Sequence, residues 1–158
     1  KINGKDKTSY FQCLAGIIVT KDKHDCLSIS PESLGINQLQ TNDITELISP
    51  TRFKILGRID FMINSGGLKI NPEQLEMKIT HLIQQPFMIG YKNDPSLGQR
   101  VVLLLESKEY EKEEEILQQI KKVLPSNQVP KEIYYINELL WTANHKLDRK
   151  RNNLYLNS

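Results

Sequence analysis

The run of residues 57–76 constrains the fold of this chain more than any other segment. Within it, Ser65-Gly66-Gly67 separates two short apolar segments, 61–64 and 68–70. Glycine accepts the positive φ angles that a tight hairpin turn requires. Asn71 and Pro72 follow, and these residue types are favoured at the N-cap and first position of a helix. The run therefore predicts a β-hairpin that leads directly into a capped helix.

The pattern on either side of this run predicts strands first and then a mixture of helices and strands. Before it, we expect a hairpin with one strand over 10–19 and the next over 26–29, and short strands at 44–48 and 53–56. After it, we expect strands at 87–91, 100–106 and 133–136, a loop at 93–98, and helices at 111–124 and 147–156. This order predicts an α+β fold in which two to three helices pack on a small, mainly antiparallel sheet. We expect a β-rich segment over 1–57 and an α+β domain over 58–158.

Composition narrows the class of protein without naming a function. Hydrophobic residues make up 39% and charged residues 25% of the chain, which is typical of a folded protein in water. No apolar run approaches the roughly 20 residues that span a bilayer, and residues 1–10 lack a signal-peptide core, so we expect a cytoplasmic protein. The two cysteines and three scattered histidines predict free thiols and no metal site. A net charge of +2 does not indicate a nucleic-acid or membrane partner.

Lys146 is the first candidate for chemistry, because it lies in a polar turn just before the last predicted helix. A lysine ammonium on such a loop can stabilise negative charge that develops on phosphate or carboxylate oxygens. Taken alone, however, the string favours a solvated basic segment near a terminus over a catalytic lysine. A nucleic-acid patch is the weakest interpretation, because no aromatic residues alternate with the basic ones.

Asp43, Arg58 and the Gly66-Gly67 pair are the other candidates. A carboxylate accepts hydrogen bonds from ribose hydroxyls, and a guanidinium donates to hydroxyls or phosphate. Taken singly, each has a structural explanation: a turn aspartate, a surface arginine, and a glycine turn that exists for its backbone angles.

Four segments in a fixed order resemble the last motifs of the acyl-adenylate-forming enzymes. That superfamily includes acyl-CoA synthetases, peptide-synthetase adenylation domains and luciferases. The matching segments are residues 41–43, 57–60, 65–76 and 142–149. Within the superfamily, residues 64–67 and 72–74 look most like o-succinylbenzoate:CoA ligase, the member that serves menaquinone biosynthesis.

The resemblance implies an ATP-dependent acid:CoA ligase with a large amino-terminal domain and a small mobile carboxyl-terminal domain. The substrates would be a small-molecule carboxylate, ATP with Mg²⁺, and CoA. By resemblance, Lys146 would contact the carboxylate and the α-phosphate during adenylation. Asp43 would bind the ribose hydroxyls, and Arg58 would bind the nucleotide side of the cleft.

The resemblance also implies that the small domain moves between two half-reactions. Asp60 would occupy the hinge. The hairpin with Gly66 and Gly67 would enter the active site during thioester formation, where the missing side chains leave room for pantetheine. Lys69 falls at the lysine position of this motif and would support that loop.

Two departures from the family pattern leave alternatives open. His145 stands where the family usually has glycine before the catalytic lysine, and Leu140 stands where a proline is common. These departures favour a non-catalytic binding or regulatory module that keeps the small-domain fold. A peptide-synthetase adenylation domain would need a carrier domain soon after the motif, and the short stretch after Arg149 favours a stand-alone CoA ligase. The family's phosphate-binding loop is absent from this sequence, so we expect residues 1–57 to be the tail of the amino-terminal domain and the chain alone to be inactive.

Overall fold

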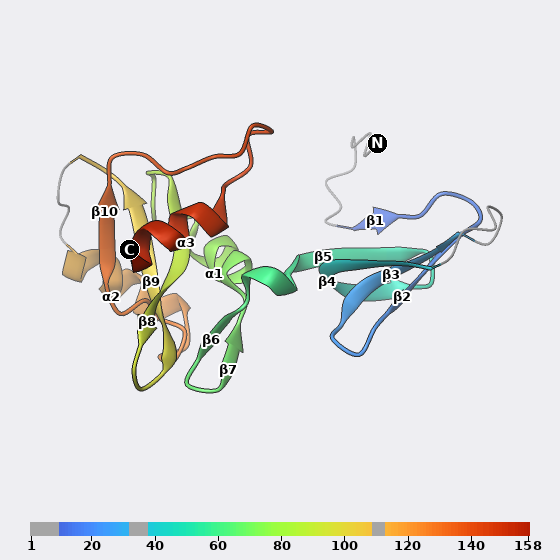
Figure 1. The fold of residues 1–158 in the computed structure, drawn as a ribbon, viewed down its shortest axis with the longest axis horizontal. Coiled ribbons are helices and arrows are strands. Elements are labelled where there is room, and N and C mark those ends of the chain that lie inside the picture. The colour runs from blue at the N-terminus through green and yellow to red at the C-terminus, as the bar shows by residue number, and fades with distance from the viewer. Residues whose placement is uncertain (1–9, 32–37, 109–112) are drawn as a thin grey trace. The chain divides into compact units, whose positions relative to one another are not determined.

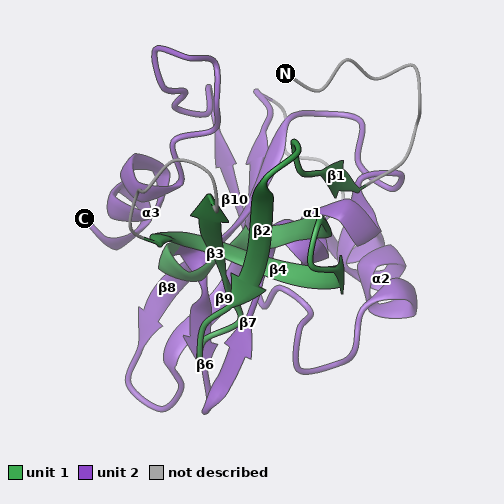
Figure 2. Cartoon of the chain, turned by 90° about the vertical axis from the view of Figure 1, so that its right-hand side faces the viewer, with its two compact units in different colours: residues 1–60 green, residues 61–158 purple. Residues whose placement is uncertain are grey.

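The structure is a computed structural model that describes residues 10–31, 38–108 and 113–158. The chain divides into two compact units, Lys1–Asp60 and Phe61–Ser158, which Figure 2 shows in different colours. The boundary between the units therefore falls three residues later in the chain than the sequence predicted. Their assignment to two domains of a larger ligase remains a prediction.

Within its described residues, the first unit is a five-stranded antiparallel sheet in the order β1-β5-β4-β3-β2. Its strands are β1 (Phe11–Gln12), β2 (Ile17–Lys21), β3 (Cys26–Pro31), β4 (Leu39–Ser49) and β5 (Arg52–Arg58). The predicted hairpin before residue 30 is present as β2 and β3, but the prediction of one strand over 10–19 is wrong. Gly16 has φ of 76°, which turns the chain, so that β1 pairs with β5 instead of continuing into β2. The short strands predicted at 44–48 and 53–56 lie within β4 and β5.

The second unit contains the α+β fold that the sequence predicts (Figure 1). Its sheet comprises β6 (Ile63–Ser65), β7 (Leu68–Ile70), β8 (Phe87–Asp94), β9 (Gly98–Glu106) and β10 (Ile133–Ile136). Its helices are α1 (Pro72–Ile79), α2 (Glu113–Val123) and α3 (Arg149–Asn157), and a 3-10 turn covers Ile59–Phe61. Only β10 runs parallel to its neighbour, β9, so the sheet is mainly antiparallel among the described residues.

The limits of the loop after β8 and of the last helix differ from those expected. Half of the predicted loop at 93–98 is strand, because β8 pairs with β9 as far as Asp94 opposite Gly98, which leaves 95–97 as the turn. Asp94 Oδ1 closes this turn by accepting from the backbone N–H groups of Ser96 and Leu97, each at 2.9 Å. The last helix begins at Arg149 rather than 147, because Asp148 caps it. The predicted start of the preceding helix at 111 lies outside the described residues.

Strand β9 forms the centre of the core because both of its faces are buried. Side chains alternate across a strand, so Val101, Leu103 and Leu105 face one cluster, with residues of α1 and α2, while Val102 and Leu104 face a second. Leu156 of α3 belongs to this second cluster. In the part of the chain that the structure describes, no helix is long and apolar enough to cross a membrane.

Candidate functional site

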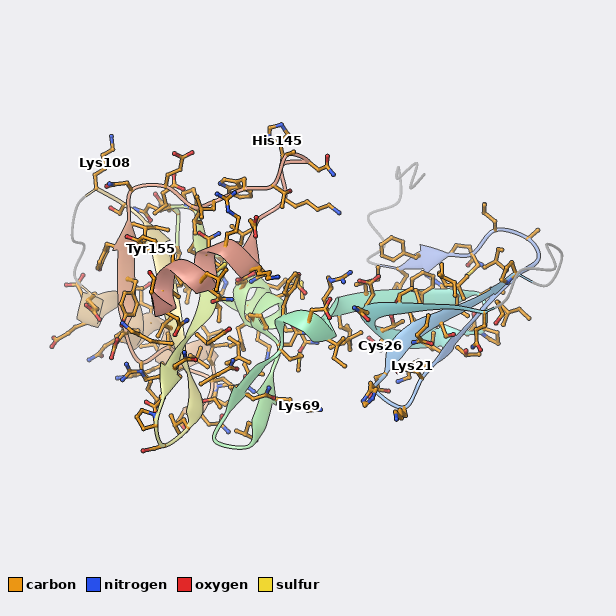
Figure 3. All side chains as sticks on the ribbon, in the orientation of Figure 1. Lys21, Cys26, Lys69, Lys108, His145 and Tyr155 are labelled. Atoms are coloured by element: carbon orange, nitrogen blue, oxygen red, sulfur yellow. The ribbon has the colours of Figure 1, made fainter. Side chains whose placement is uncertain are left out.

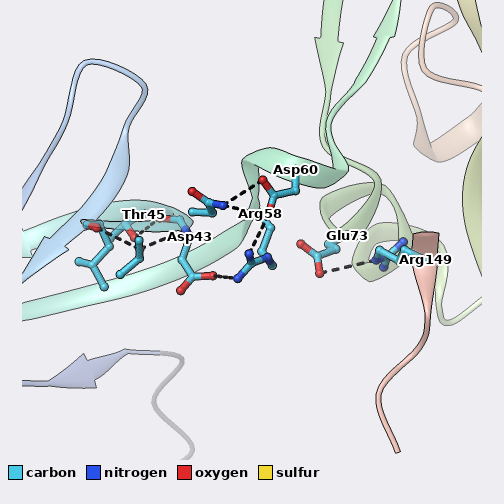
Figure 4. Close-up of polar contacts among 9 residues, drawn as sticks. Asp43, Thr45, Arg58, Asp60, Glu73 and Arg149 are labelled. Carbon is cyan, nitrogen blue, oxygen red and sulfur yellow. Dashed lines mark hydrogen bonds and ion pairs between the residues drawn. The ribbon is translucent and has the colours of Figure 1, made fainter. Parts of the chain in front are cut away.

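The predicted nucleotide and hinge residues form one polar cluster in the first unit (Figure 4). Strands β4 and β5 pair so that Asp43 lies directly opposite Arg58. Arg58 Nη1 donates to Asp43 Oδ1 at 3.2 Å, and Nη2 donates to Asp60 Oδ2 at 2.7 Å. Asn42 Nδ2 donates to both carboxylate oxygens of Asp60, at 3.0 and 3.1 Å. One guanidinium therefore joins the predicted ribose ligand to the predicted hinge residue.

The charges in this cluster stabilise one another. The hydrogen bond to Asp60 raises the pKa of Arg58. That bond, with a smaller contribution from Asn42, lowers the pKa of Asp60. The Arg58 and Asp60 side chains are 41% and 42% exposed, so each ion pair adds about 0–1 kcal/mol at most. The contacts in this cluster therefore orient the side chains more than they stabilise the fold.

The glycine hairpin has the geometry that its sequence predicts. Gly66 and Gly67 have φ of 56° and 82°, and the flanking strands pair Ser65 with Leu68. Two consecutive positive φ angles define the turn that matches the twist of a two-residue hairpin. A Cβ at Gly66 would approach Leu97 Cδ2 to 3.2 Å, whereas a Cβ at Gly67 would meet nothing within 4 Å. Lys69 is exposed on β7 (Figure 3).

Lys146 lies in a closed loop between β10 and α3. Trp141 pairs with Leu147, and the Thr142 N–H donates to the Lys146 carbonyl at 2.7 Å. Thr142 Oγ1 in turn accepts from the Lys146 N–H at 3.1 Å. His145 has φ of 54° and lies at the outer end of the loop (Figure 3). The backbone at His145 is thus left-handed, the conformation that glycine adopts most readily.

The glycine hairpin and the Lys146 loop lie at opposite ends of the second unit. The turn between β6 and β7 is at one end and the loop before α3 at the other, in both views (Figures 1 and 2). The second unit therefore keeps these two predicted sites apart, and Asp43, Arg58 and Asp60 form a separate group in the first unit.

A buried ion pair joins two of the motifs, and sequence reasoning did not find it. Arg149 Nη1 donates to Glu76 Oε1 at 2.9 Å, and Nη2 pairs with Oε2. The guanidinium also lies 3.7 Å from Glu73 Oε1 and 5.8 Å from the centre of the Phe61 ring. Burial raises the pKa of Glu76, an effect that Arg149 and the Ile89 N–H oppose. Nothing in the sequence signals a contact between residues 73 positions apart.

Asn42 and Asn152 were also not identified from the sequence as residues of a site. Asparagine is common in turns and on helix surfaces, so its presence alone does not indicate a site. No group of three or more His, Cys, Asp or Glu side chains suited to a metal ion occurs among the residues that the structure describes.

The fold is that of the adenylate-forming enzymes. An acyl-CoA synthetase (AMP-forming)/AMP-acid ligase II-like protein from Dyadobacter fermentans matches 96% of this chain, and 45% of its own chain is covered, with 31% identity and a TM-score of 0.56. ATP-bound MatB from Rhodopseudomonas palustris has a TM-score of 0.74 at 14% identity over 91% of this chain and 35% of its own. A single-residue variant of E. coli MenE with bound OSB-AMS has a TM-score of 0.71 at 22% identity, over 91% of this chain and 34% of its own. At this identity, MatB and MenE support the fold alone.

Curated relatives are ligases with different substrates in their names. D-alanine–D-alanyl carrier protein ligase of Bacillus licheniformis is 31% identical over 103 residues, which is 61% of this chain and 20% of the relative. Oxalate–CoA ligase of Saccharomyces cerevisiae is 34% identical over 119 residues, 72% of this chain and 22% of the relative. The chain thus spans about a fifth of the length of these relatives. No protein-family model matches it.

Proposed function

We propose that this chain is the carboxyl-terminal part of an AMP-forming acid ligase that joins a carboxylate to a thiol. Residues 1–57 are the tail of the amino-terminal adenylation domain, and residues 58–158 are the mobile domain. The observation that carries this proposal is the separation of the glycine hairpin and the Lys146 loop at opposite ends of one unit. A domain that serves two half-reactions in turn needs two separate surfaces, one for each reaction.

In the first half-reaction, a carboxylate oxygen attacks the α-phosphorus of ATP. The bond from that phosphorus to the bridging oxygen breaks, and pyrophosphate leaves with the electron pair. Lys146 neutralises the charge on the carboxylate and α-phosphate oxygens, which lowers the barrier electrostatically. Asp43 and Arg58 hold the nucleotide, with Mg²⁺ travelling as part of the ATP substrate.

In the second half-reaction, a thiol sulfur attacks the acyl carbon and AMP leaves, while the thiol proton passes to solvent. Asp60 is the hinge between the two poses, and the turn at Gly66 and Gly67 lies against the pantetheine arm, with Lys69 beside it. A Cβ at Gly67 would meet open space, which supports a surface kept clear for another molecule.

The acid and the thiol define the finer proposal. We propose o-succinylbenzoate and CoA, on the resemblance of residues 64–67 and 72–74. The curated relatives supply the alternatives, because their names include D-alanine with a carrier protein, and oxalate with CoA. Pyrophosphate exchange in the full-length protein with o-succinylbenzoate, D-alanine and oxalate, followed by transfer to CoA or a carrier protein, distinguishes them. If no acid supports exchange, the ligase proposal is wrong.

Replacing Lys146 with Ala tests its role. We expect pyrophosphate exchange to fall about 10²–10³-fold, the usual loss when one stabilising donor is removed. Transfer from preformed acyl-adenylate to the thiol should change little. Lys150→Ala is the matched control, because Lys150 is an exposed lysine on α3. Equal exchange rates in the Lys146 variant and the control would remove the proposed role.

Substitutions at Gly67 test the thiol-facing surface. Gly67→Val adds bulk and strains a residue at φ of 82°, whereas Gly67→Asn adds bulk at a backbone angle that asparagine tolerates. We expect both variants to slow thioester formation more than adenylation. If only the valine variant is impaired, backbone strain explains the loss and the surface assignment fails.

The alternative is a non-catalytic module, which the departures at His145 and Leu140 favour. His145 takes the left-handed conformation while the hydrogen bonds between Thr142 and Lys146 stay formed, which supports the ligase over the module.

A further inference from the structure

The base of the Lys146 loop is closed by the side-chain amide of Asn152. This residue is 2% exposed. Its Oδ1 accepts from the Leu140 N–H at 3.1 Å, and its Nδ2 donates to the carbonyl oxygens of Leu140 at 3.0 Å and Asp148 at 2.9 Å. The Asp148 N–H also donates to the Leu140 carbonyl at 2.9 Å. One amide thus binds the chain before the loop and after it.

Helix α3, which carries Asn152, is itself fixed to the sheet. Asn153 Oδ1 accepts from the Tyr91 N–H at 3.1 Å, and Asn157 Oδ1 accepts from the Asn93 N–H at 2.8 Å. Asn157 Nδ2 also donates to the Tyr91 carbonyl at 3.0 Å. These groups lie on the side of β8 that faces away from β9, so side chains of α3 satisfy an edge that would otherwise be open.

The close approach of helix and strand depends on Gly90. A Cβ there would lie 2.6 Å from Asn153 Oδ1, which is too short for any real contact. The amide of Asn152 is therefore held at a fixed place relative to the sheet, and a buried polar group with its hydrogen bonds made is costly to displace.

We propose that Asn152 is a positioning residue that sets where Lys146 meets the reacting oxygens during adenylation. The inference rests on the proposed ligase function. A lysine on an exposed loop has many available positions, and a clamp at both ends of that loop restricts the backbone from which its side chain extends. Displacement of a charge-stabilising group by about 1 Å costs about 10²-fold in rate.

The test uses Asn152→Leu and Asn152→Ala in the full-length protein. Leucine fills a similar volume without hydrogen bonds, so it separates the clamp from simple packing. We expect pyrophosphate exchange with the accepted acid to fall about 10–100-fold in both variants, while thiol transfer from preformed acyl-adenylate stays within about 2-fold. A double variant that combines Lys146→Ala with either Asn152 substitution should catalyse pyrophosphate exchange at the same rate as Lys146→Ala alone.

Asn153→Ala is the matched control, because it removes an α3 amide that binds β8 and not the loop. It should lower pyrophosphate exchange less than the Asn152 variants do, because the hydrogen bonds from Asn152 to the loop remain. Hydrogen exchange gives a readout that does not depend on activity: the Leu140 amide should lose protection in the Asn152 variants and keep it in Asn153→Ala.

The outcomes separate the two proposals. If no acid supports exchange, the proposed function fails and this inference fails with it. If Lys146→Ala leaves exchange unchanged, the proposed role of Lys146 fails, and so does the positioning role of Asn152. If Lys146→Ala is impaired but Asn152→Leu exchanges at the rate of the unsubstituted protein, only the positioning role is wrong. Equal losses in both half-reactions of the Asn152 variants would make Asn152 a general stabilising residue and would also overturn the inference.

Discussion

Replacing Arg149 with Leu should destabilise the second unit strongly at neutral pH and much less in mild acid. The Arg149 and Glu76 side chains are 8% and 17% exposed, so the substitution leaves a buried carboxylate without its partner. Removing one member of a buried ion pair costs about 3–5 kcal/mol. With a urea dependence of about 1.5 kcal/mol per molar for a domain of this size, the unfolding midpoint should fall by about 2–3 M.

The dependence on pH follows from the pKa of Glu76. Burial raises this pKa above its ordinary value of 4.5 in the folded protein, and the loss of Arg149 removes a group that opposes the rise. The folded variant therefore binds a proton more tightly than the unfolded chain does. Its stability is greatest below the ordinary pKa and is lost as pH rises through the folded pKa. The loss of unfolding free energy caused by Arg149→Leu should therefore be smaller at pH 5 than at pH 8.

Urea unfolding at pH 5 and pH 8 measures this difference. The chain has a single tryptophan, Trp141, in the second unit, so its fluorescence follows that unit. Adding Glu76→Gln to the Arg149→Leu variant is the control, because an amide has no charge to desolvate and should abolish the pH-dependent part. If Arg149→Leu costs the same free energy at both pH values, an unpaired Glu76 is not the cause of the loss.

Three further outcomes follow from local geometry. Gly90→Ala should lower the free energy of unfolding by about 1–3 kcal/mol, because the new Cβ would lie 2.6 Å from Asn153 Oδ1. Urea unfolding measures this loss, and no loss would mean that α3 shifts freely. His145→Val should lower the free energy of unfolding by about 1–2 kcal/mol and His145→Gly should leave it unchanged, because φ at this position is 54°. Equal thermal midpoints for the two variants would refute the left-handed turn. The lowered pKa of Asp60 means that its contribution to stability is present above the ordinary value of 3.8 and is lost as pH falls through the folded pKa. Asp60→Asn should therefore reduce the difference in unfolding free energy between pH 6 and pH 3, by less than about 1 kcal/mol because the pair is exposed. Urea unfolding at the two pH values measures it, and an unchanged difference would contradict the Arg58 contact.

Short-range signals predicted the most accurate parts of the fold. The hairpin at Gly66 and Gly67 and the helix that begins after Asn71 lie where the sequence placed them. Asn71 Oδ1 accepts from the backbone N–H groups of Glu73 and Gln74, at 3.1 and 3.3 Å. Such turns and caps are decided by the conformational preferences of a few consecutive residues, so the sequence contains nearly all of their energetics.

Strand limits were less predictable, because a strand ends where its partner ends. Residues 93 and 94 contain typical turn types, yet they pair with β9 through Gln99 and Gly98. Residues 10–19 look continuous, yet Gly16 divides them and β1 joins a strand some forty positions away, with Phe11 opposite Phe53. The interaction that decides each limit lies on another segment of the chain.

The sequence by itself determined the α+β class, the glycine hairpin, the capped helix, and the order of the motifs that contain Asp43, Arg58 and Lys146. Only the tertiary structure decided that one guanidinium joins Asp43 to Asp60, that Glu76 is buried against Arg149, and that the asparagines of α3 hold the Lys146 loop and the edge of β8. The physical reason is distance along the chain. Backbone preferences act between neighbours, whereas a buried polar group is satisfied by whichever partner the packed core brings to it, which for Glu76 and Arg149 lies 73 residues away.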